Sequence, residues 1–128
     1  MKTRFVFGCA MVCFSMTAVA FCQDAVKVDP KHYKVELENA QVRVLRVHYG
    51  PHEKSVIHSH PDSVAVYLTD GKIRMTDANG KTQDMTGKAG ETLFTPAQVH
   101  LPENTGDGPF EVILVELKGK PAKASAMK

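Results

Sequence analysis

The chain has 128 residues, with 16 basic, 14 acidic and 6 histidine residues and a formal net charge of +2 at neutral pH. This length fits a single domain, and the near balance of charge gives no reason to expect nucleic acid or an anionic membrane surface as a partner. A domain of about 100 residues buries roughly 60–70 % of its surface on folding, which suffices for one hydrophobic core.

Residues 1–20 have the pattern of a secretory signal peptide. Lys2 and Arg4 precede an apolar run, and Ala18-Val19-Ala20 supplies the small residues that precede a signal-peptidase site. We expect cleavage after residue 20, or alternatively after Cys22, and export to the periplasm or the medium. The alternative is an uncleaved anchor, because the apolar run is just long enough to span a bilayer.

Cleavage would change both the charge and the cysteine count. Without Lys2 and Arg4 the 16 basic residues fall to the number of acidic ones, 14. Cys9 and Cys13 would also leave, so the processed chain would keep at most Cys22 and would form no internal disulfide. We expect this neutral chain to have no nucleic-acid partner and no membrane partner.

The rest of the chain reads as one domain with no internal repeat. We predict a lead-in over residues 21–32, the domain over residues 33–118 and a flexible basic tail over residues 119–128. The tail combines lysines with Gly, Pro and small residues, which is typical of a frayed end.

Two alternating runs of polar and apolar residues open the domain. Tyr33–Leu37 alternates, as does Gln41–Val44, and both patterns predict strands. The second run then changes phase, with apolar residues at Leu45, Val47 and Tyr49, which predicts a bulge or bend in that strand.

The middle of the domain combines one continuous apolar run with strong turn signals. Val64–Leu68 is apolar on both faces, as expected for a strand packed from two sides. Asp70-Gly71 and Asn79-Gly80 are predicted hairpin turns on either side of a strand over residues 72–77.

The last third of the chain continues as strands and turns. Lys88–Glu91 is a predicted turn before a strand at Thr92–Thr95, and Phe110–Leu117 is a final, strongly apolar strand. Asn104–Pro109 is a predicted loop, which Asn104 ties down through side-chain to backbone hydrogen bonds. Because no helical period appears after residue 25 and strands recur every 8–12 residues, we predict an all-β sandwich or barrel.

The strongest functional signal is a set of three histidines. In an extended strand alternate side chains share a face, so His58 and His60 of the sequence His58-Ser59-His60 point the same way. With a third imidazole from another strand, at His100, they would supply three corners of a metal site.

These histidines lie in two motifs that resemble those of the cupin superfamily and together cover roughly residues 41–117. The motifs are Gly50-x7-His58-x-His60 followed by Gly71, and Gly90-x5-Pro96 followed by His100-x3-Asn104. The resemblance implies a cupin-type double-stranded β-helix or jelly-roll barrel in which the three histidines converge on a metal. It also implies a homodimer, because cupins are commonly dimers.

The sequence departs from the family pattern in both motifs. The first cupin motif has a glutamate as a fourth ligand three or four residues after its second histidine, where this chain has Val64 and Ala65. The second motif has Gln98 in place of the usual glycine, and its histidine comes one residue early. A three-histidine site without the glutamate is known within the superfamily, for example in thiol dioxygenases.

The donor set narrows the choice of metal. Three neutral imidazoles favour a divalent transition metal (zinc, iron, copper or nickel) over calcium or magnesium, which prefer oxygen ligands. Three protein ligands leave coordination positions open for water or substrate. Val64 in place of a carboxylate would leave the site more positive and its wall more apolar, which favours an anionic or chelating small molecule.

The other titratable residues give weaker signals. His32, His48 and His52 match no motif position and are predicted to be surface or strand-end residues. Glu53 and Glu103 are the carboxylates nearest the histidines in sequence, and each is predicted to be a solvated loop residue, with replacement ligand, partner of a ligand or acid/base group as alternatives.

Two functional classes remain open from the sequence. The first is a metal-dependent dioxygenase, isomerase or lyase acting on a small molecule. The second is a non-catalytic module that binds a small ligand or a metal. The sequence identifies no catalytic residue, because no nucleophile, acid/base pair or cofactor-binding loop is recognisable.

Overall fold

The computed structural model describes residues 23–119, so the predicted signal peptide and almost all of the predicted tail lie outside the described residues. The described chain forms one short helix and nine strands: α1 (Ala25–Val28), β1 (Tyr33–Glu38), β2 (Val42–Tyr49), β3 (His58–His60), β4 (Ser63–Tyr67), β5 (Gly71–Asp77), β6 (Thr82–Gly87), β7 (Thr92–Thr95), β8 (Gln98–Asn104) and β9 (Phe110–Leu117).

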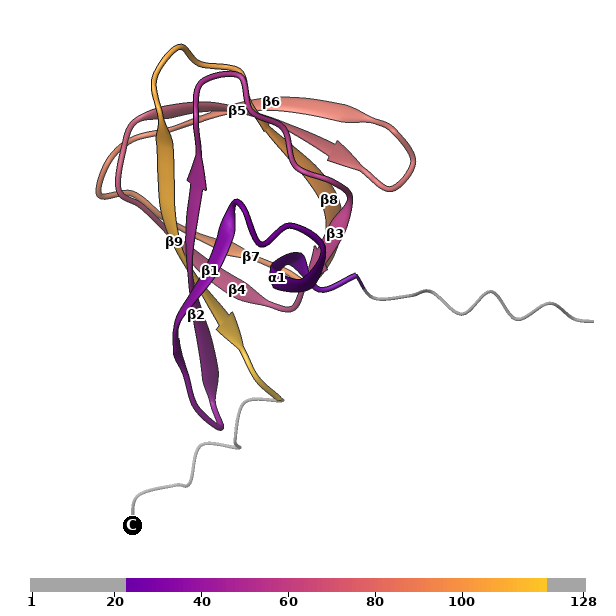
Figure 1. Ribbon diagram of the computed structural model, residues 1–128, viewed down its shortest axis with the longest axis vertical. Coiled ribbons are helices and arrows are strands. Elements are labelled where there is room, and N and C mark those ends of the chain that lie inside the picture. The colour runs from indigo at the N-terminus through magenta and orange to yellow at the C-terminus, as the bar shows by residue number, and fades with distance from the viewer. Residues whose placement is uncertain (1–22, 120–128) are drawn as a thin grey trace, which may run out of the picture.

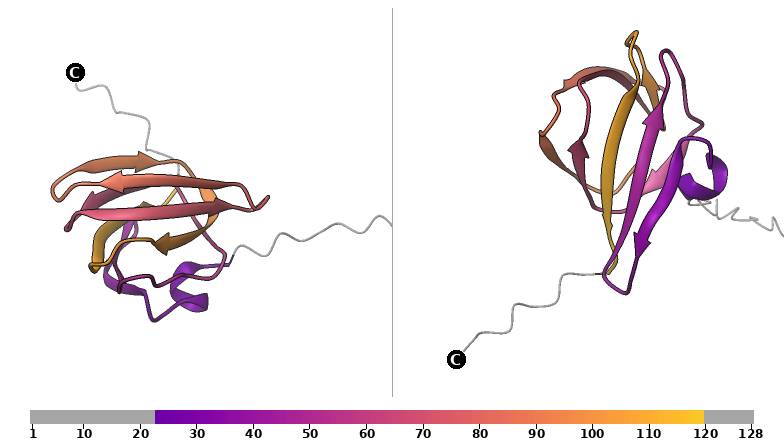
Figure 2. Two further views of the ribbon diagram at one scale, coloured as in Figure 1. Left: turned by 90° about the horizontal axis from the view of Figure 1, so that it is seen from above. Right: turned by 60° about the vertical axis from the view of Figure 1, so that its left-hand side comes forward.

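The strands form two antiparallel sheets that face each other (Figures 1 and 2). One sheet has the strand order β1-β2-β9-β4-β7 and the other the order β3-β8-β5-β6. Neighbours within each sheet are mostly far apart in sequence, as in a jelly roll. The prediction of an all-β, jelly-roll barrel is therefore confirmed.

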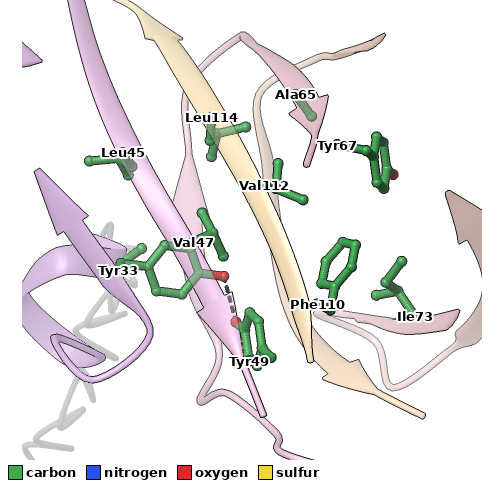
Figure 3. Close-up of a cluster of buried hydrophobic side chains, with 11 residues drawn as sticks. Tyr33, Leu45, Val47, Tyr49, Ala65, Tyr67, Ile73, Phe110, Val112 and Leu114 are labelled. Carbon is green, nitrogen blue, oxygen red and sulfur yellow. Dashed lines mark hydrogen bonds between the residues drawn. The ribbon is translucent and has the colours of Figure 1, made fainter. Parts of the chain in front are cut away.

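The core lies between the two sheets (Figure 3). Its members come from the inward positions of β1, β2, β4, β5 and β9 and include Leu45, Tyr49, Ile73, Phe110 and Leu114. Within this otherwise apolar cluster, the hydroxyl groups of Tyr33 and Tyr49 are 2.7 Å apart and satisfy each other. Of the residues that the structure describes, none belongs to a helix long and apolar enough to cross a membrane.

The strand β4 differs from its prediction. Ser63, Ala65 and Tyr67 point inward and are buried, whereas Val64 and Val66 lie half-buried on the outer face. Nothing in residues 23–119 forms a second layer over that outer face, so the strand is packed from one side only. The apolar run therefore predicted more burial for β4 than the structure shows.

The predicted bulge in the second strand is also misplaced. β2 pairs with β9 in an unbroken register, whereas the register shift occurs in β1, between Val35 and Leu37. The change of phase in β2 has a simpler cause: Leu45 faces the core with every second residue after it, while Val44 lies on the outer face. Both faces of one regular strand carry apolar residues.

The two predicted hairpin turns have different outcomes. Asn79-Gly80 does join β5 to β6, and Gly80 has a φ of 83° that favours glycine. Asp70-Gly71 instead connects β4 to β5, which belong to different sheets, so no hairpin forms there. Gly71 is needed for space, because a Cβ atom at this position would lie 2.2 Å from the Phe110 ring.

The helix α1 was not predicted, because four residues are too few to show a helical period. Asp24 caps it by accepting a hydrogen bond from the backbone N–H of Val26 at 2.9 Å. Ala25 is fully buried, and α1 packs beside β1 and β3 (Figure 1). The segment before the first strand is thus part of the packed structure.

Candidate metal centre

The structure brings His58, His60 and His100 together inside the barrel. β3 pairs antiparallel with β8, and His58 lies directly opposite His100 in that register. One ring nitrogen from each histidine lies within 4.8 Å of the other two. All three side chains are buried, so a set of residues forty positions apart in sequence forms one compact cluster.

His58 is oriented by its own loop. Its Nδ1 atom is 2.7 Å from the carbonyl oxygen of Val56, which can only accept a hydrogen bond, so Nδ1 carries the proton. The other nitrogen, Nε2, is buried and has no hydrogen-bond partner among the described residues. Its lone pair is available to a ligand.

His60 is oriented by a carboxylate from the other sheet. Its Nδ1 atom lies 2.6 Å from Oε1 of Glu116, which projects inward from β9. The other oxygen of Glu116 accepts a hydrogen bond from Nε of Arg43 at 2.5 Å, and Arg43 in turn donates to Asp24 at 2.7 Å. Burial raises the pKa of Glu116, but the bonds to His60 and Arg43 outweigh it and the net shift is downward. An ionised Glu116 accepts the Nδ1 proton of His60 and leaves Nε2 free to bind a metal.

His100 has no hydrogen-bond partner in the described part of the chain on either ring nitrogen, and both nitrogens are buried. A buried polar atom without a partner carries a desolvation cost, so native structures rarely contain one without a reason. A ligand bound to one of the His100 nitrogens would remove the desolvation cost of that nitrogen.

The environment keeps two of these imidazoles neutral. Burial lowers the pKa of His58 to about 4 and that of His100 to about 3, and repulsion from neighbouring histidines adds to the effect. At neutral pH each of these two rings therefore keeps one nitrogen with a free lone pair, which is the form that binds a metal.

These features fit a divalent transition metal. Three imidazole nitrogens form the donor set, the tautomers of His58 and His60 are fixed by hydrogen bonds, and buried nitrogens lack partners. Two nitrogens bound to one tetrahedral zinc ion at about 2.0–2.1 Å lie about 3.3–3.4 Å apart. At a separation of 4.8 Å, the rings would therefore have to approach each other by roughly 1.4 Å to hold an ion.

The residue expected to replace the missing glutamate lies on the wrong face. Val64 points outward from β4, so it does not line the site, whereas Ala65 points inward and lines the cavity described below. The apolar wall predicted from the sequence is present, but Ala65 supplies it.

His32 also differs from its prediction as a surface or strand-end residue. It is buried, with Nδ1 2.7 Å from Asp29 and Nε2 3.1 Å from Glu53, and its ring stacks on Tyr49 at 4.3 Å. The two carboxylates and the stacked ring compensate for its burial. His48 and His52 are exposed, as predicted.

A buried polar network connects His32 to the metal centre. Asp29 accepts a hydrogen bond from Ser55 Oγ at 2.5 Å. The Oγ atom of Ser55 also lies 3.3 Å from Nδ1 of His58. Burial alone would raise the pKa of Asp29, but hydrogen bonds from Ser55 and His32 give a net decrease. The network thus supports His58 from the side opposite its free nitrogen.

The predicted loop carboxylates do not join the histidine cluster. Glu53 accepts hydrogen bonds from Lys31 at 2.5 Å and from the backbone N–H of Gly50 at 2.7 Å, which lower its pKa to about 2. Glu103 lies on β8 rather than in a loop and is half-buried opposite Arg74.

The prediction for Asn104 is confirmed. Its amide group donates to the carbonyl groups of Gly50 and Gly108, at 3.0 and 2.9 Å, and accepts from the N–H of Gly106. The side chain therefore anchors the loop before β9.

Both oriented histidines depend on residues 23–32, which we call the N-terminal segment. One chain of contacts runs from His60 through Glu116 and Arg43 to Asp24, and the other runs from His58 through Ser55 to Asp29. In addition, the backbone carbonyl of Gln23 accepts a hydrogen bond from the N–H group of Ser59, between the two histidines. Sequence reasoning missed this role, because the segment carries no motif and its contacts are all with distant residues.

Two of the three histidines line a cavity of about 320 Å³ within the barrel. His60 and His100 form part of its lining, together with mainly apolar side chains such as Ile73, Met85 and Phe110. Exposed residues of β6, β7 and β8 also line the cavity. Because β6 and β7 are edge strands of the two sheets, the cavity reaches the surface between these edges. A small molecule entering there would meet two of the three histidines.

Comparison with known proteins agrees with this architecture. The family model described as "Cupin domain" matches residues 45–116, and this chain belongs to that family. A search of curated proteins gave no match.

Solved structures with the same fold come from several bacteria. A cupin domain from Bordetella pertussis is 24 % identical with a TM-score of 0.64, covering 68 % of this chain and 92 % of that one. An uncharacterized conserved protein with a double-stranded beta-helix domain from Klebsiella pneumoniae is 27 % identical with a TM-score of 0.52, covering 69 % and 84 %. A cupin superfamily protein from Desulfitobacterium hafniense is 17 % identical with a TM-score of 0.52, covering 68 % and 76 %.

Proposed function

We propose that this cupin binds one divalent transition metal through His58, His60 and His100 and presents it to a small molecule in the barrel cavity. The observation that carries the proposal is the cluster of one ring nitrogen from each histidine within 4.8 Å of the others, in which buried nitrogens of His58 and His100 have no hydrogen-bond partner among the described residues. Zinc, iron, copper and nickel all suit three imidazole donors.

The bound metal would supply Lewis-acid or redox chemistry and open coordination positions. The chain's own residues would hold the ion, fix the ring tautomers through Val56 and Glu116, and surround the ligand with apolar walls. These roles support a dioxygenase, isomerase or lyase that acts on a small molecule.

A non-catalytic binding module is the second candidate, and the tyrosines beside the site favour it. Tyr33 and Tyr49 hydrogen-bond to each other, and burial raises the pKa of both, so neither is poised to exchange a proton near neutral pH. An enzyme built on this site would therefore depend on the metal more than on side-chain acid/base groups.

Elemental analysis and metal titration of the processed protein test the proposal. We expect one ion per chain for the wild type, and a sharp loss of affinity for His58→Ala, His60→Ala and His100→Ala. His48→Ala and His52→Ala are matched controls, because both residues are exposed histidines, and they should bind like the wild type. If the three site variants bind each metal as the wild type does, the metal-free binding module becomes the better account.

The proposal includes export to the periplasm or the medium and assembly as a homodimer. Mass spectrometry of exported protein should find an N-terminus at Phe21, or at Gln23 if the second site is used. Intact Met1 in the membrane fraction would favour an anchor instead. Light scattering measures the oligomeric state, and a monomer mass would remove the dimer from the proposal.

A further inference from the structure

We propose that the cavity accepts a neutral, mainly apolar small molecule about the size of one substituted ring, which contacts the metal through a single heteroatom. The contact between the heteroatom and the metal rests on the proposed function. The size and polarity of the ligand follow from the residues that line the cavity.

The volume sets the size of the ligand. A cavity of about 150 Å³ lined by aliphatic and aromatic residues accepts benzene. The cavity here, at about 320 Å³, is roughly twice that size. It is at the small end of the range for ligand sites, which excludes nucleotides and oligosaccharides as complete occupants.

The walls set its polarity. Most lining side chains are aliphatic, aromatic or thioether groups, including Ile73, Met75, Met85, Phe110 and Leu114. Several polar groups in the lining already have partners: Tyr33 and Tyr49 pair with each other, and the amide of Asn104 is bound to three backbone groups. The amides of Gln83 and Gln98 lie in the exposed part of the lining, and Glu103 is half-buried. The buried part of the cavity therefore offers few replacement hydrogen bonds to a ligand with many hydroxyl groups.

The charges in the lining argue against a permanent anion. No lysine or arginine belongs to the lining as far as residues 23–119 define it. Arg43, which is connected to His60 through Glu116, is paired with Glu116 and Asp24. A carboxylate or phosphate entering the cavity would therefore be desolvated without a side-chain counter-ion.

The charge of a bound metal does not reverse this argument. Glu116 and Asp29 already lie behind His60 and His58, where they offset the positive charge of an ion without occupying the cavity. The ligand then needs to supply only one neutral donor atom, such as the hydroxyl oxygen of a phenol. This replaces the sequence-based expectation of an anionic or chelating ligand.

A matched pair of probes tests the ligand class: 4-ethylphenol and 4-ethylbenzoate, which are similar in size but differ in charge. Calorimetric titrations of metal-free and zinc-loaded protein should show at least tenfold tighter binding of the neutral probe, with the negative heat-capacity change of apolar burial. Equal or tighter binding of 4-ethylbenzoate would overturn the proposal, as would failure of both probes to bind.

Two variants place the probe in the cavity. Ala65→Leu fills part of it and should weaken binding of 4-ethylphenol at least tenfold, whereas Val66→Leu, on the outer face of the same strand, should not. If Ala65→Leu fails to fold, Gln98→Lys gives an independent answer, because a cation in the exposed part of the lining should raise the affinity for 4-ethylbenzoate. If Ala65→Leu leaves the affinity for 4-ethylphenol unchanged and Gln98→Lys leaves the affinity for 4-ethylbenzoate unchanged, the probes bind elsewhere and the proposal is overturned.

Zinc titration of the same samples separates this inference from the proposed function. If zinc binds and 4-ethylbenzoate is preferred, the ligand class is wrong and the metal site stands. If zinc does not bind but 4-ethylphenol occupies the cavity, the metal proposal is wrong and the ligand class stands.

Discussion

His60 and Glu116 belong to opposite sheets of the barrel, yet Nδ1 of His60 lies 2.6 Å from Oε1 of Glu116. The contact joins a predicted metal ligand to a fully buried carboxylate that Arg43 holds from its other side. Partners of this kind fix the tautomer and the direction of a metal-binding histidine. Glu116 therefore positions a ligand without being one.

Replacing Glu116 by Gln should weaken zinc binding by about 10–100-fold, because the amide no longer offers a charged acceptor to His60. Competition titration against a chelator measures the change. Glu111→Gln is the control, since Glu111 lies on the same strand and bonds to Arg46, away from the histidines. Equal affinities for the two variants would show that Glu116 has no positioning role.

Removing the cap of α1 should destabilise the protein. Asp24→Ala removes both the hydrogen bond to Val26 and the ion pair with Arg43, and loss of a cap costs about 0.5–2 kcal/mol of unfolding free energy. Asp24→Asn keeps a capping side chain and should cost less. Denaturant unfolding of both variants checks this, and two equal losses would assign the whole effect to the charge.

The metal-free protein should lose stability as the pH falls below about 6.5. In the unfolded chain histidine takes up protons near that pH, whereas the folded values for His58 and His100 are about 4 and 3. The unfolded state thus binds more protons between these limits, so the contribution from both residues is complete above pH 6.5 and falls towards pH 4.

Urea midpoints measured from pH 7 to pH 4 test this dependence. The variant His100→Gln removes one of the two groups and should show a shallower decrease than the wild type. A midpoint that is independent of pH over this range would contradict the buried, neutral state of the histidines.

The core assignment also has a direct test. Leu114→Ala should lower the unfolding free energy by about 2–5 kcal/mol, because Leu114 is buried between the sheets. Val115→Ala, at the neighbouring outward position of β9, should cost clearly less. An unmoved midpoint for Leu114→Ala would mean that the faces of β9 are assigned the wrong way round.

Much of the barrel follows from local sequence patterns. The bounds of β7 and β9 agree with those predicted, and the spacing of His58 and His60 correctly places both on one face. The errors arose where apolar residues occupy both faces of a strand, as at Val44 in β2 and Val64 in β4. When both faces of a strand carry apolar residues, alternation does not show which face is buried. The hydrophobic effect favours burial of either face equally.

The residues that orient the histidines were harder to predict from the sequence, with the exception of Glu116. Glu116 follows Phe110, Val112 and Leu114 at the same inward parity, so the sequence did contain a signal for a buried carboxylate that needs a partner. The roles of Asp24 and Asp29 depend on the path of the N-terminal segment across the barrel. That path is set by tertiary packing, which no local pattern encodes.

X-ray absorption spectroscopy of zinc-loaded protein tests the central claim most directly, because it counts the ligands around the ion and identifies their type. The account predicts three imidazole nitrogens at about 2.0–2.1 Å and a loss of one imidazole in His100→Ala. A zinc ion without imidazole ligands, or a spectrum that His100→Ala leaves unchanged, would contradict it.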